Sequence, residues 1–279
     1  MLAKLVRMNT ISQPQLAFIG GGNMATAIVG GLLRAGRSPE SMLIVEPWAE
    51  QRARLASSAP GVRVLAEAGA ELAASALVVW AVKPQQFAEA AAPCRAHIGQ
   101  ALQLSIMAGT TCARIAEATG AAAIVRAMPN TPALIGQGIA GLYATAAVSA
   151  GQREAAAAVL APTGTLLWVA QEADLDAVTA LSGSGPAYVF FFIEAMVDAG
   201  VQMGLPAEQA RQLAQETFAG AAQLAMRSSE PPATLRERVT SKGGTTHAAI
   251  STLEAEGVKA AFVKALHAAR DRAQALGRG

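Results

Sequence analysis

The stretch QLAFIGGGNMATAIVGGLL, residues 15–33, decides the fold of this chain. An apolar run suited to a strand leads into three glycines and then into a helical pattern. Gly20, Gly22 and Ala25 match the pattern G-x-G-x-x-A, in which the first glycine makes a tight turn and the second admits a pyrophosphate. The stretch therefore predicts a dinucleotide-binding strand, loop and helix. Its expected coenzyme contacts are Gly20, Gly22, Asn23 and Met24.

The next apolar run, MLIVE at residues 42–46, predicts a second strand that ends in an acid, Glu46. A carboxylate at this point accepts hydrogen bonds from the adenine ribose hydroxyls and favours NADH, because it repels a 2′-phosphate. Arg52 and Arg54 follow closely and are able to serve such a phosphate. Either NADH or NADPH therefore remains possible, and a solvated strand-end acid is the alternative interpretation of Glu46.

Further apolar runs alternate with alanine-rich helical stretches as far as Glu172, and only helical patterns follow it. Such alternation is typical of a parallel sheet covered on both faces. The runs lie at 62–66, 76–82, 102–108 and 122–128, with two more expected to extend the sheet at 138–144 and 165–170. We expect a flexible N-terminal extension over 1–14, an α/β Rossmann-like domain over 15–172, and an all-α domain over 173–279.

Composition narrows the class of protein. The chain has 279 residues, of which 15% are charged, and a formal net charge of +2, which is too small to favour nucleic acid. Cys94 and Cys112 lie in no metal-ligand pattern, so no metal site is expected. No uninterrupted apolar stretch reaches about 18 residues, and none resembles a signal peptide. We expect a cytoplasmic oligomer without a membrane span.

A second glycine loop, VTSKGGTTHAAI at residues 239–250, also runs into a helix. Free backbone N–H groups and the positive end of the helix dipole make such a loop suited to an anion. The presence of two such loops in one chain is explained if the first holds a dinucleotide and the second holds a small carboxylate substrate.

Three other motifs have physical interpretations of their own. AVKP, residues 81–84, follows a strand at its C-terminal edge, so Ala81, Val82, Lys83 and Pro84 are expected to border the nicotinamide ribose. MPNTP, residues 128–132, predicts a stiff turn. Either Asn130 contacts the coenzyme from this turn, or the turn is simply a rigid loop. SGSGPAY, residues 182–188, predicts a helix start with Ser184 as the N-cap.

Together with RAMPNTPALIGQG (126–138) and LSGSGPAYVFFFIEAM (181–196), these motifs resemble the pyrroline-5-carboxylate reductase family in type and order. The resemblance spans nearly the whole chain from about residue 16. It implies a Rossmann-like domain, a helical domain that dimerises, and a homodimer or a larger ring of dimers. It also implies reduction of 1-pyrroline-5-carboxylate to L-proline by NADPH or NADH, the last step of proline biosynthesis, with both domains and both subunits at the active site.

The resemblance also implies roles for the second loop. Its substrate-binding residues are Ser241, Gly243, Gly244, Thr245 and Thr246. The amides of Gly244 and Thr245 hold the carboxylate, and the hydroxyl of Thr246, the expected catalytic residue, faces the ring nitrogen. Lys242 stands where many members of the family carry proline, which loosens the loop and adds a cation.

Three alternative functions share parts of this pattern. A β-hydroxyacid dehydrogenase carries a motif similar to G-x-G-x-x-x-K at its substrate helix. Val189 stands at the lysine position of that motif here, which argues against this function. A nucleotide sensor without catalysis predicts a degraded second site, yet both SKGGTTH and MPNTP are intact. An imine reductase acting on a six-membered or substituted ring stays open, because no residue measures ring size.

Overall fold

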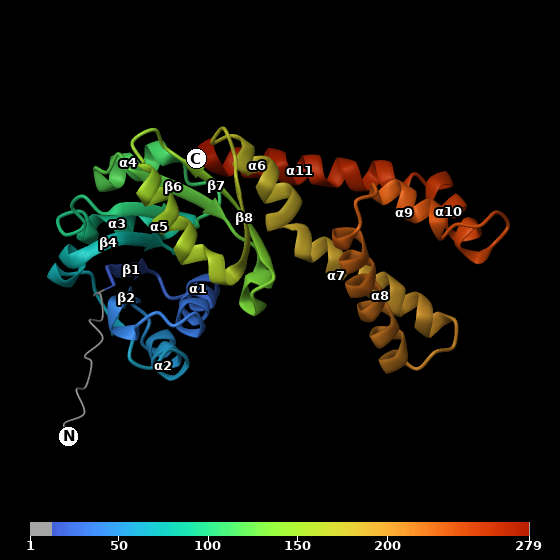
Figure 1. The fold of residues 1–279 in the computed structure, drawn as a ribbon, viewed down its shortest axis with the longest axis horizontal. Helices are drawn as coiled ribbons and strands as arrows, with labels where there is room; N and C mark the ends of the chain where they lie inside the picture. The colour runs from blue at the N-terminus through green and yellow to red at the C-terminus, as the bar shows by residue number, and fades with distance from the viewer. Residues whose placement is uncertain (1–12, 279) are drawn as a thin grey trace, which may run out of the picture. The chain divides into compact units, whose positions relative to one another are not determined.

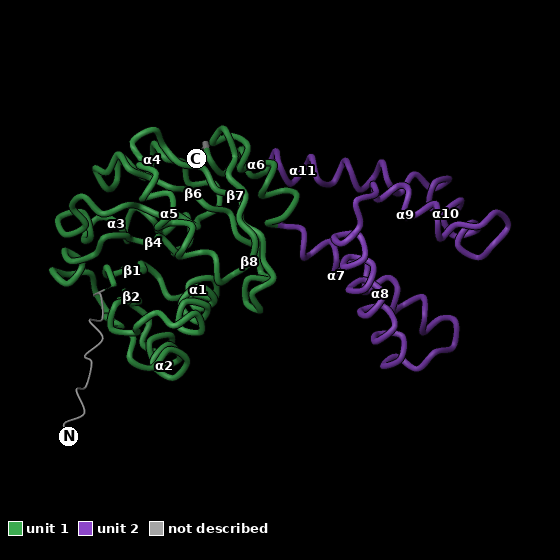
Figure 2. The backbone as a smooth tube through the Cα atoms, viewed as in Figure 1, with its two compact units in different colours: residues 1–183, 272–279 green, residues 184–271 purple. Residues whose placement is uncertain are grey.

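The computed structural model describes residues 13–278, so most of the extension expected over 1–14 lies outside the described residues. The chain divides into two compact units, coloured separately in Figure 2. Unit 1 comprises Met1–Gly183 and Arg272–Gly279, and unit 2 comprises Ser184–Asp271.

Unit 1 contains an eight-stranded sheet with the order β3-β2-β1-β4-β5-β6-β7-β8 (Figure 1). The strands are β1 Gln15–Ile19, β2 Met42–Val45, β3 Arg63–Leu65, β4 Ser75–Trp80, β5 Leu102–Ser105, β6 Ile124–Met128, β7 Gly138–Ala144 and β8 Gly164–Trp168. The first six strands are parallel, whereas β7 runs antiparallel to β6 and β8 runs parallel to β7. The predicted α/β class is confirmed, including both extending strands.

Helices cover both faces of this sheet. They are α1 Asn23–Arg34, α2 Ala49–Ser58, α3 Phe87–Cys94, α4 Cys112–Thr119, α5 Ala150–Leu160 and α6 Asp174–Val178. Short 3₁₀ turns lie at Pro39–Ser41, Ala70–Ala74, Pro84–Gln86, Thr131–Ile135 and Ala161–Thr163. Because successive strand residues face opposite sides, Phe18 enters one apolar cluster with Ile28, while Ala17 enters another with Phe87. Near-continuous apolar strands follow from this double burial.

The strand order reverses direction beside β1. The chain proceeds from β1 to β2 and β3 on one side, then returns to place β4 and β5 on the other side. In open α/β sheets, ligands bind at the carboxyl ends of the strands where the order reverses. The ends of β1 and β4 are therefore the expected ligand position.

Unit 2 is helical, as the sequence predicts. Its helices are α7 Gly185–Gln202, α8 Ala207–Arg227, α9 Pro232–Arg238, α10 Thr245–Ala255 and α11 Val258–Arg278, of which the last turns belong to unit 1. Ser184 occupies the N-cap position of α7 as expected, but its backbone is helical and its side chain makes no cap hydrogen bond. The reason is that α6 continues through a π-helical turn, Thr179–Gly183, directly into α7.

Unit 2 buries little apolar surface within one chain. Among its described residues, the buried ones are three small residues, Gly200, Ala210 and Ala214. By contrast, Phe191 is 65% exposed and Met226 is 79% exposed. So large an apolar surface is typical of an interface with another protein or a membrane.

One helical run among the described residues, Asp174–Gln202, is long and apolar enough to cross a membrane by length and composition alone. Only 6% of its most apolar window is buried inside the chain. A single such helix is weak evidence for a membrane span, because a helix that packs in a protein core or interface passes the same test. Glu194 and Asp198 interrupt its apolar sequence.

The start of β8 gives a test of the sheet. Gly164 has φ +138°, and a Cβ there would lie 1.9 Å from the carbonyl oxygen of Gly138 on β7. We predict that Gly164→Ala lowers the free energy of unfolding by at least about 2 kcal/mol in denaturant titrations at fixed protein concentration. The control Gly151→Ala, on α5 with open space around it, should change stability by less than about 1 kcal/mol. Equal stability of the two variants would contradict this packing.

Candidate functional site

The first glycine loop turns tightly between two strand ends. Gly20 has φ +95°, and its N–H donates to the carbonyl oxygen of Val45 at 2.8 Å. A Cβ on Gly20 would lie 2.7 Å from the carbonyl oxygen of Ala81. Only glycine combines this backbone conformation with this close approach, so the loop brings the ends of β1, β2 and β4 together.

The next part of the loop is open. A Cβ on Gly22 would meet no atom within 4 Å, and both Gly22 and Asn23 are exposed. Helix α1 begins at Asn23 without a side-chain cap, which leaves its first backbone N–H groups available to an anion. Open space over these amides fits the pyrophosphate of a dinucleotide.

Glu46 is held by the loop itself. It is 8% exposed, and its Oε2 accepts from the Gly21 N–H at 2.9 Å. Its Oε1 accepts from the Trp48 N–H at 3.0 Å. The carboxylate is thus not a solvated strand-end acid. Both of its oxygens anchor backbone, which makes Glu46 a positioning residue for the loop as well as a candidate ribose contact.

The segment between β2 and α2, together with α2 itself, also contacts Gly21. The Gln51 side chain donates to the Gly21 carbonyl oxygen at 2.6 Å, and a Cβ on Gly21 would lie 2.5 Å from Leu55 Cδ1. The sequence does not reveal this role of Gln51, because a polar residue in the first turn of a helix has no distinguishing pattern. Gly21 is therefore fixed at both its N–H and its carbonyl.

The two arginines considered for a 2′-phosphate are both engaged. Arg52 Nη1 donates to the carbonyl oxygens of Glu46 at 3.0 Å and Pro47 at 2.6 Å. Arg54 pairs with Glu50 at 2.6 Å on the exposed face of α2. An exposed pair of this kind is weak, so Arg54 exchanges partners more readily than Arg52.

The AVKP segment borders the glycine loop. The Ala81 N–H donates to the carbonyl oxygen of Ile19 at 2.8 Å, and Val82 Cγ1 would lie 2.9 Å from a Cβ on Gly20. Lys83 is exposed and precedes the 3₁₀ turn that begins at Pro84. This segment therefore lies at the end of β4, beside the loop, as expected from the sequence.

Asn130 connects two motifs. Its Nδ2 donates to the Ser182 carbonyl oxygen at 3.1 Å, and its Oδ1 accepts from the Ile139 N–H at 3.0 Å. The residue is 9% exposed. Its amide therefore ties the MPNTP turn to the SGSGP segment. A coenzyme contact from the same side chain remains a prediction.

An ion pair joins buried Arg126 on β6 to half-buried Glu172. Arg126 Nη1 pairs with Glu172 Oε1 at 2.7 Å, and the same oxygen accepts from the Cys112 N–H at 2.7 Å. Burial and then the Glu172 charge raise the pKa of the Cys112 thiol to about 12. This thiol therefore stays protonated and is not a nucleophile at neutral pH.

The second glycine loop lies in unit 2. Gly243 has φ +76°, and the Gly244 N–H donates to the Ser241 carbonyl oxygen at 3.0 Å, which closes the turn. Helix α10 then begins at Thr245 without a side-chain cap. The Gly244 amide, expected to hold a carboxylate, is thus already engaged, whereas the amides of Thr245 and Thr246 are uncapped; Thr246 is half-buried. Lys242, within this turn, is exposed.

Within residues 13–278, no group of three or more His, Cys, Asp or Glu side chains is placed to hold a metal ion. The candidate site residues of the described chain are glycines, backbone and side-chain amides, hydroxyls, the lysines Lys83 and Lys242, and the anchoring carboxylate of Glu46. The amides, hydroxyls and lysines bind and orient anions. This arrangement, on a Rossmann-like unit followed by a helical unit, defines a nicotinamide-coenzyme oxidoreductase.

Comparison with known proteins specifies the family. Residues 172–276 match the pyrroline-5-carboxylate reductase dimerisation family, and residues 15–109 match the family described as NADP oxidoreductase, coenzyme F420-dependent. The pyrroline-5-carboxylate reductase of Pseudomonas aeruginosa is 46% identical, over 95% of this chain and 98% of that protein. That of Haemophilus influenzae is 40% identical, over 94% and 97% respectively. The chain belongs to the pyrroline-5-carboxylate reductase family.

Solved structures agree. The pyrroline-5-carboxylate reductase of Coxiella burnetii has a TM-score of 0.87 at 36% identity, covering 94% of this chain and 98% of that one. The Plasmodium falciparum pyrroline carboxylate reductase with NADP bound has a TM-score of 0.84 at 28% identity, covering 95% and 98%. A Streptomyces aurantiacus imine reductase, at 17% identity, 95% and 94% coverage and a TM-score of 0.54, shares the fold alone.

The anchoring of Gly21 gives a test. Glu46→Gln leaves one acceptor oxygen where two backbone N–H groups need one each, and it turns an NH₂ donor toward the other. We predict that the Kd for NADPH and for NADH rises about tenfold and that the thermal midpoint falls. Coenzyme titration and thermal melts measure both. Glu154→Gln, an exposed position on α5 with no part in the loop, should change neither. An unchanged Kd and midpoint in Glu46→Gln would refute the anchoring role.

Proposed function

We propose that the protein is a pyrroline-5-carboxylate reductase that transfers a hydride from NAD(P)H to the cyclic imine of 1-pyrroline-5-carboxylate and yields L-proline. This is the last step of proline biosynthesis, and we place it in the cytoplasm. One observation carries the proposal: two uncapped helix starts, at Asn23 and Thr245, each follow a glycine loop. A dinucleotide and a small carboxylate are the two anions that this reaction needs.

The coenzyme supplies the hydride when it is bound. We assign the pyrophosphate to the open face of Gly22 and to the amides of Asn23 and Met24. Gly20 lets the loop turn and Glu46 holds its middle residue. Ala81, Val82, Lys83 and Pro84 border the nicotinamide ribose, and Asn130 holds the turn beside it. The geometry of Gly20 and Gly22 supports this assignment, because added side chains would clash at the first and block the open face at the second.

The substrate is assigned to the second loop. The carboxylate accepts hydrogen bonds from the Thr245 and Thr246 amides, because the Gly244 amide already donates to Ser241. Gly243 provides the left-handed turn, and Ser241 closes it. The Thr246 hydroxyl oxygen accepts from the ring N–H of the protonated imine and fixes the orientation of the ring.

This assignment explains why no acid–base pair is required. When the ring nitrogen is already protonated, the hydride forms a C–H bond at the imine carbon. The electron pair of the C=N π bond then moves to nitrogen and neutralises its charge. No proton transfer accompanies this step, so the residues of the chain contribute position and orientation, with reacting atoms at roughly 3–3.5 Å.

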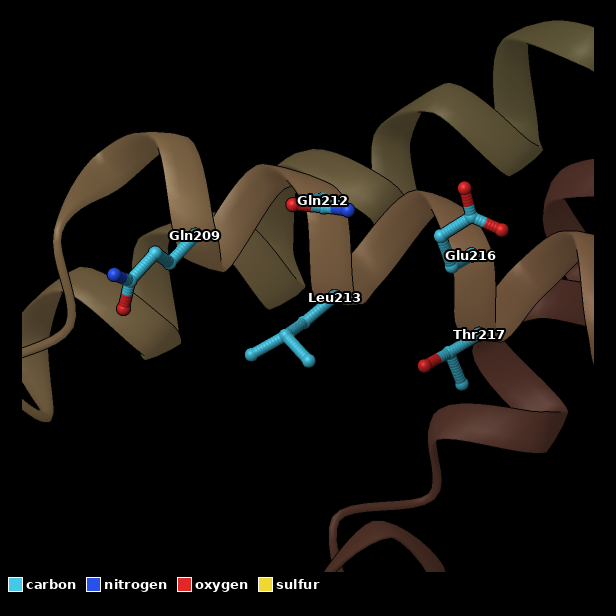
Figure 3. Close-up of a pocket in the computed structure, with 5 residues that line it drawn as sticks. All are labelled: Gln209, Gln212, Leu213, Glu216 and Thr217. Atoms are coloured by element: carbon cyan, nitrogen blue, oxygen red, sulfur yellow. The ribbon is translucent and has the colours of Figure 1, made fainter.

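We further propose that the protein forms a homodimer through unit 2. Such dimers are able to assemble into a larger ring. The support is the exposed apolar surface of unit 2 and the match of 172–276 to a dimerisation family. An open hollow of about 550 Å³ lies on α8 and is lined by residues of that helix alone. Figure 3 shows Gln209, Leu213 and Thr217 projecting from the same side of α8. One helix does not enclose a small molecule, so a second subunit is the proposed occupant.

The first test is the reaction itself. We predict loss of reduced-nicotinamide absorbance when 1-pyrroline-5-carboxylate is added with NADPH or NADH, with L-proline as the product. Glu46 predicts appreciable use of NADH, and activity confined to NADPH would refute that interpretation. A six-membered cyclic imine, run in parallel, tests the alternative ring. Absence of turnover with both imines, in protein that binds coenzyme, would overturn the proposed function.

A second test addresses Thr246. We predict that Thr246→Ala lowers kcat about tenfold or more, because the ring nitrogen loses the acceptor that orients it, while the Kd for the coenzyme stays near wild type. Thr246→Ser keeps the hydroxyl and should retain most of the activity. Steady-state kinetics and coenzyme titration separate the two effects. Equal loss of coenzyme binding in the alanine variant would show that Thr246 is misassigned.

A further inference from the structure

Trp48 is an exposed aromatic residue beside the glycine loop, and the proposed function gives it no role. Its exposed fraction is 63%, whereas Trp80 is fully buried and Trp168 is half-buried under Arg153. It occupies the N-cap position of α2, two residues beyond Glu46 at the end of β2. A large indole left in solvent at such a place calls for a physical explanation.

The backbone that carries this indole is fixed. The Trp48 N–H donates to Glu46 Oε1 at 3.0 Å, and its carbonyl oxygen accepts from the Arg52 N–H at 2.9 Å. Arg52 Nη1 also donates to the carbonyl oxygen of the preceding residue, Pro47. The backbone of Trp48 is therefore held at both its N–H and its carbonyl oxygen, so the exposure of the indole does not arise from a loose loop.

The same hydrogen bonds connect Trp48 to the coenzyme loop. Glu46 accepts from Trp48 with one oxygen and from Gly21 with the other. One carboxylate thus sets the position of Trp48 relative to the loop assigned to the pyrophosphate. In a doubly wound sheet, the adenosine half of a dinucleotide lies at the end of β2. Trp48 is fixed at that end.

The groups around this position leave adenosine recognition incomplete. Each oxygen of Glu46 accepts one backbone hydrogen bond and keeps a second lone pair for a ribose hydroxyl. The Arg52 guanidinium donates to two backbone carbonyls, so neither residue is assigned to the adenine base. The adenine base, by contrast, has an apolar face that binds well to an aromatic ring. A tryptophan offers the largest such ring and loses little conformational entropy when its backbone is fixed.

We propose that Trp48 is a further coenzyme-binding residue, whose indole stacks on the adenine ring of NADPH or NADH. This inference rests on the proposed function only in assigning the dinucleotide to the first glycine loop. Because the adenine is common to both coenzymes, the contact raises affinity for both and does not choose between them. The contact is made to the coenzyme and not to the reacting atoms.

The test compares coenzymes with and without adenine. In titrations followed by calorimetry, Trp48→Ala should raise the Kd for NADPH and NADH by roughly five- to a hundredfold. Trp48→Phe, which keeps an aromatic face, should recover most of the affinity. ADP-ribose, which has adenine but no nicotinamide, should lose affinity for the alanine variant in the same proportion. The reduced mononucleotide NMNH, which lacks adenine, should show the same KM with wild-type and variant protein.

Controls separate stacking from a structural effect. Trp168→Phe should leave the Kd for every coenzyme unchanged, and thermal midpoints of the Trp48 variants should match wild type. An unaltered Kd for ADP-ribose in Trp48→Ala would overturn the proposal, as would an equal loss with NMNH. Either result is distinct from failure of the proposed function, which would abolish imine reduction in wild-type protein.

Discussion

The close approach of two strand ends governs the geometry of unit 1. At Gly20, the backbone leaves β1 so near to the carbonyl of Ala81 that a single added carbon would lie 2.7 Å from its oxygen. The parallel pairing of β1 with β4 sets this distance, and Gly20 also bonds to the last residue of β2. The proposed site for the dinucleotide lies at this contact, because the uncapped first turn of α1 follows it directly.

A second consequence is that the proposed anion site is formed by backbone, with side chains only in supporting roles. Gly21 is fixed through its N–H and its carbonyl, so the following amides of α1 are already oriented when no ligand is bound. Preorganised donors need no rearrangement as the ligand arrives. The loop at Gly243 and Gly244 uses the same device, with Ser241 in the place of the anchoring side chains.

The sequence predicts well whatever depends on local pattern. The strand-rich runs of unit 1, the start of α1 at Asn23 and the start of α10 at Thr245 all follow from periodicity and glycine placement. Contacts between residues distant in the sequence are not encoded in this way. Nothing local distinguishes Gln51 as a partner of Gly21, or Asn130 as a partner of Ser182. Ser184 is a related case: the sequence places it at the start of α7, but no local pattern reveals the π-helical turn that precedes it.

The double engagement of Glu46 constrains how this enzyme is able to evolve. An acid that only contacted ribose would be free to change whenever the cell's balance of coenzymes changed. Here the same side chain holds the loop, so its replacement disturbs the site for every coenzyme at once. We therefore expect a change of coenzyme preference to be tolerated first at neighbouring exposed positions, such as Arg54, and at position 46 only after another residue has taken over the loop.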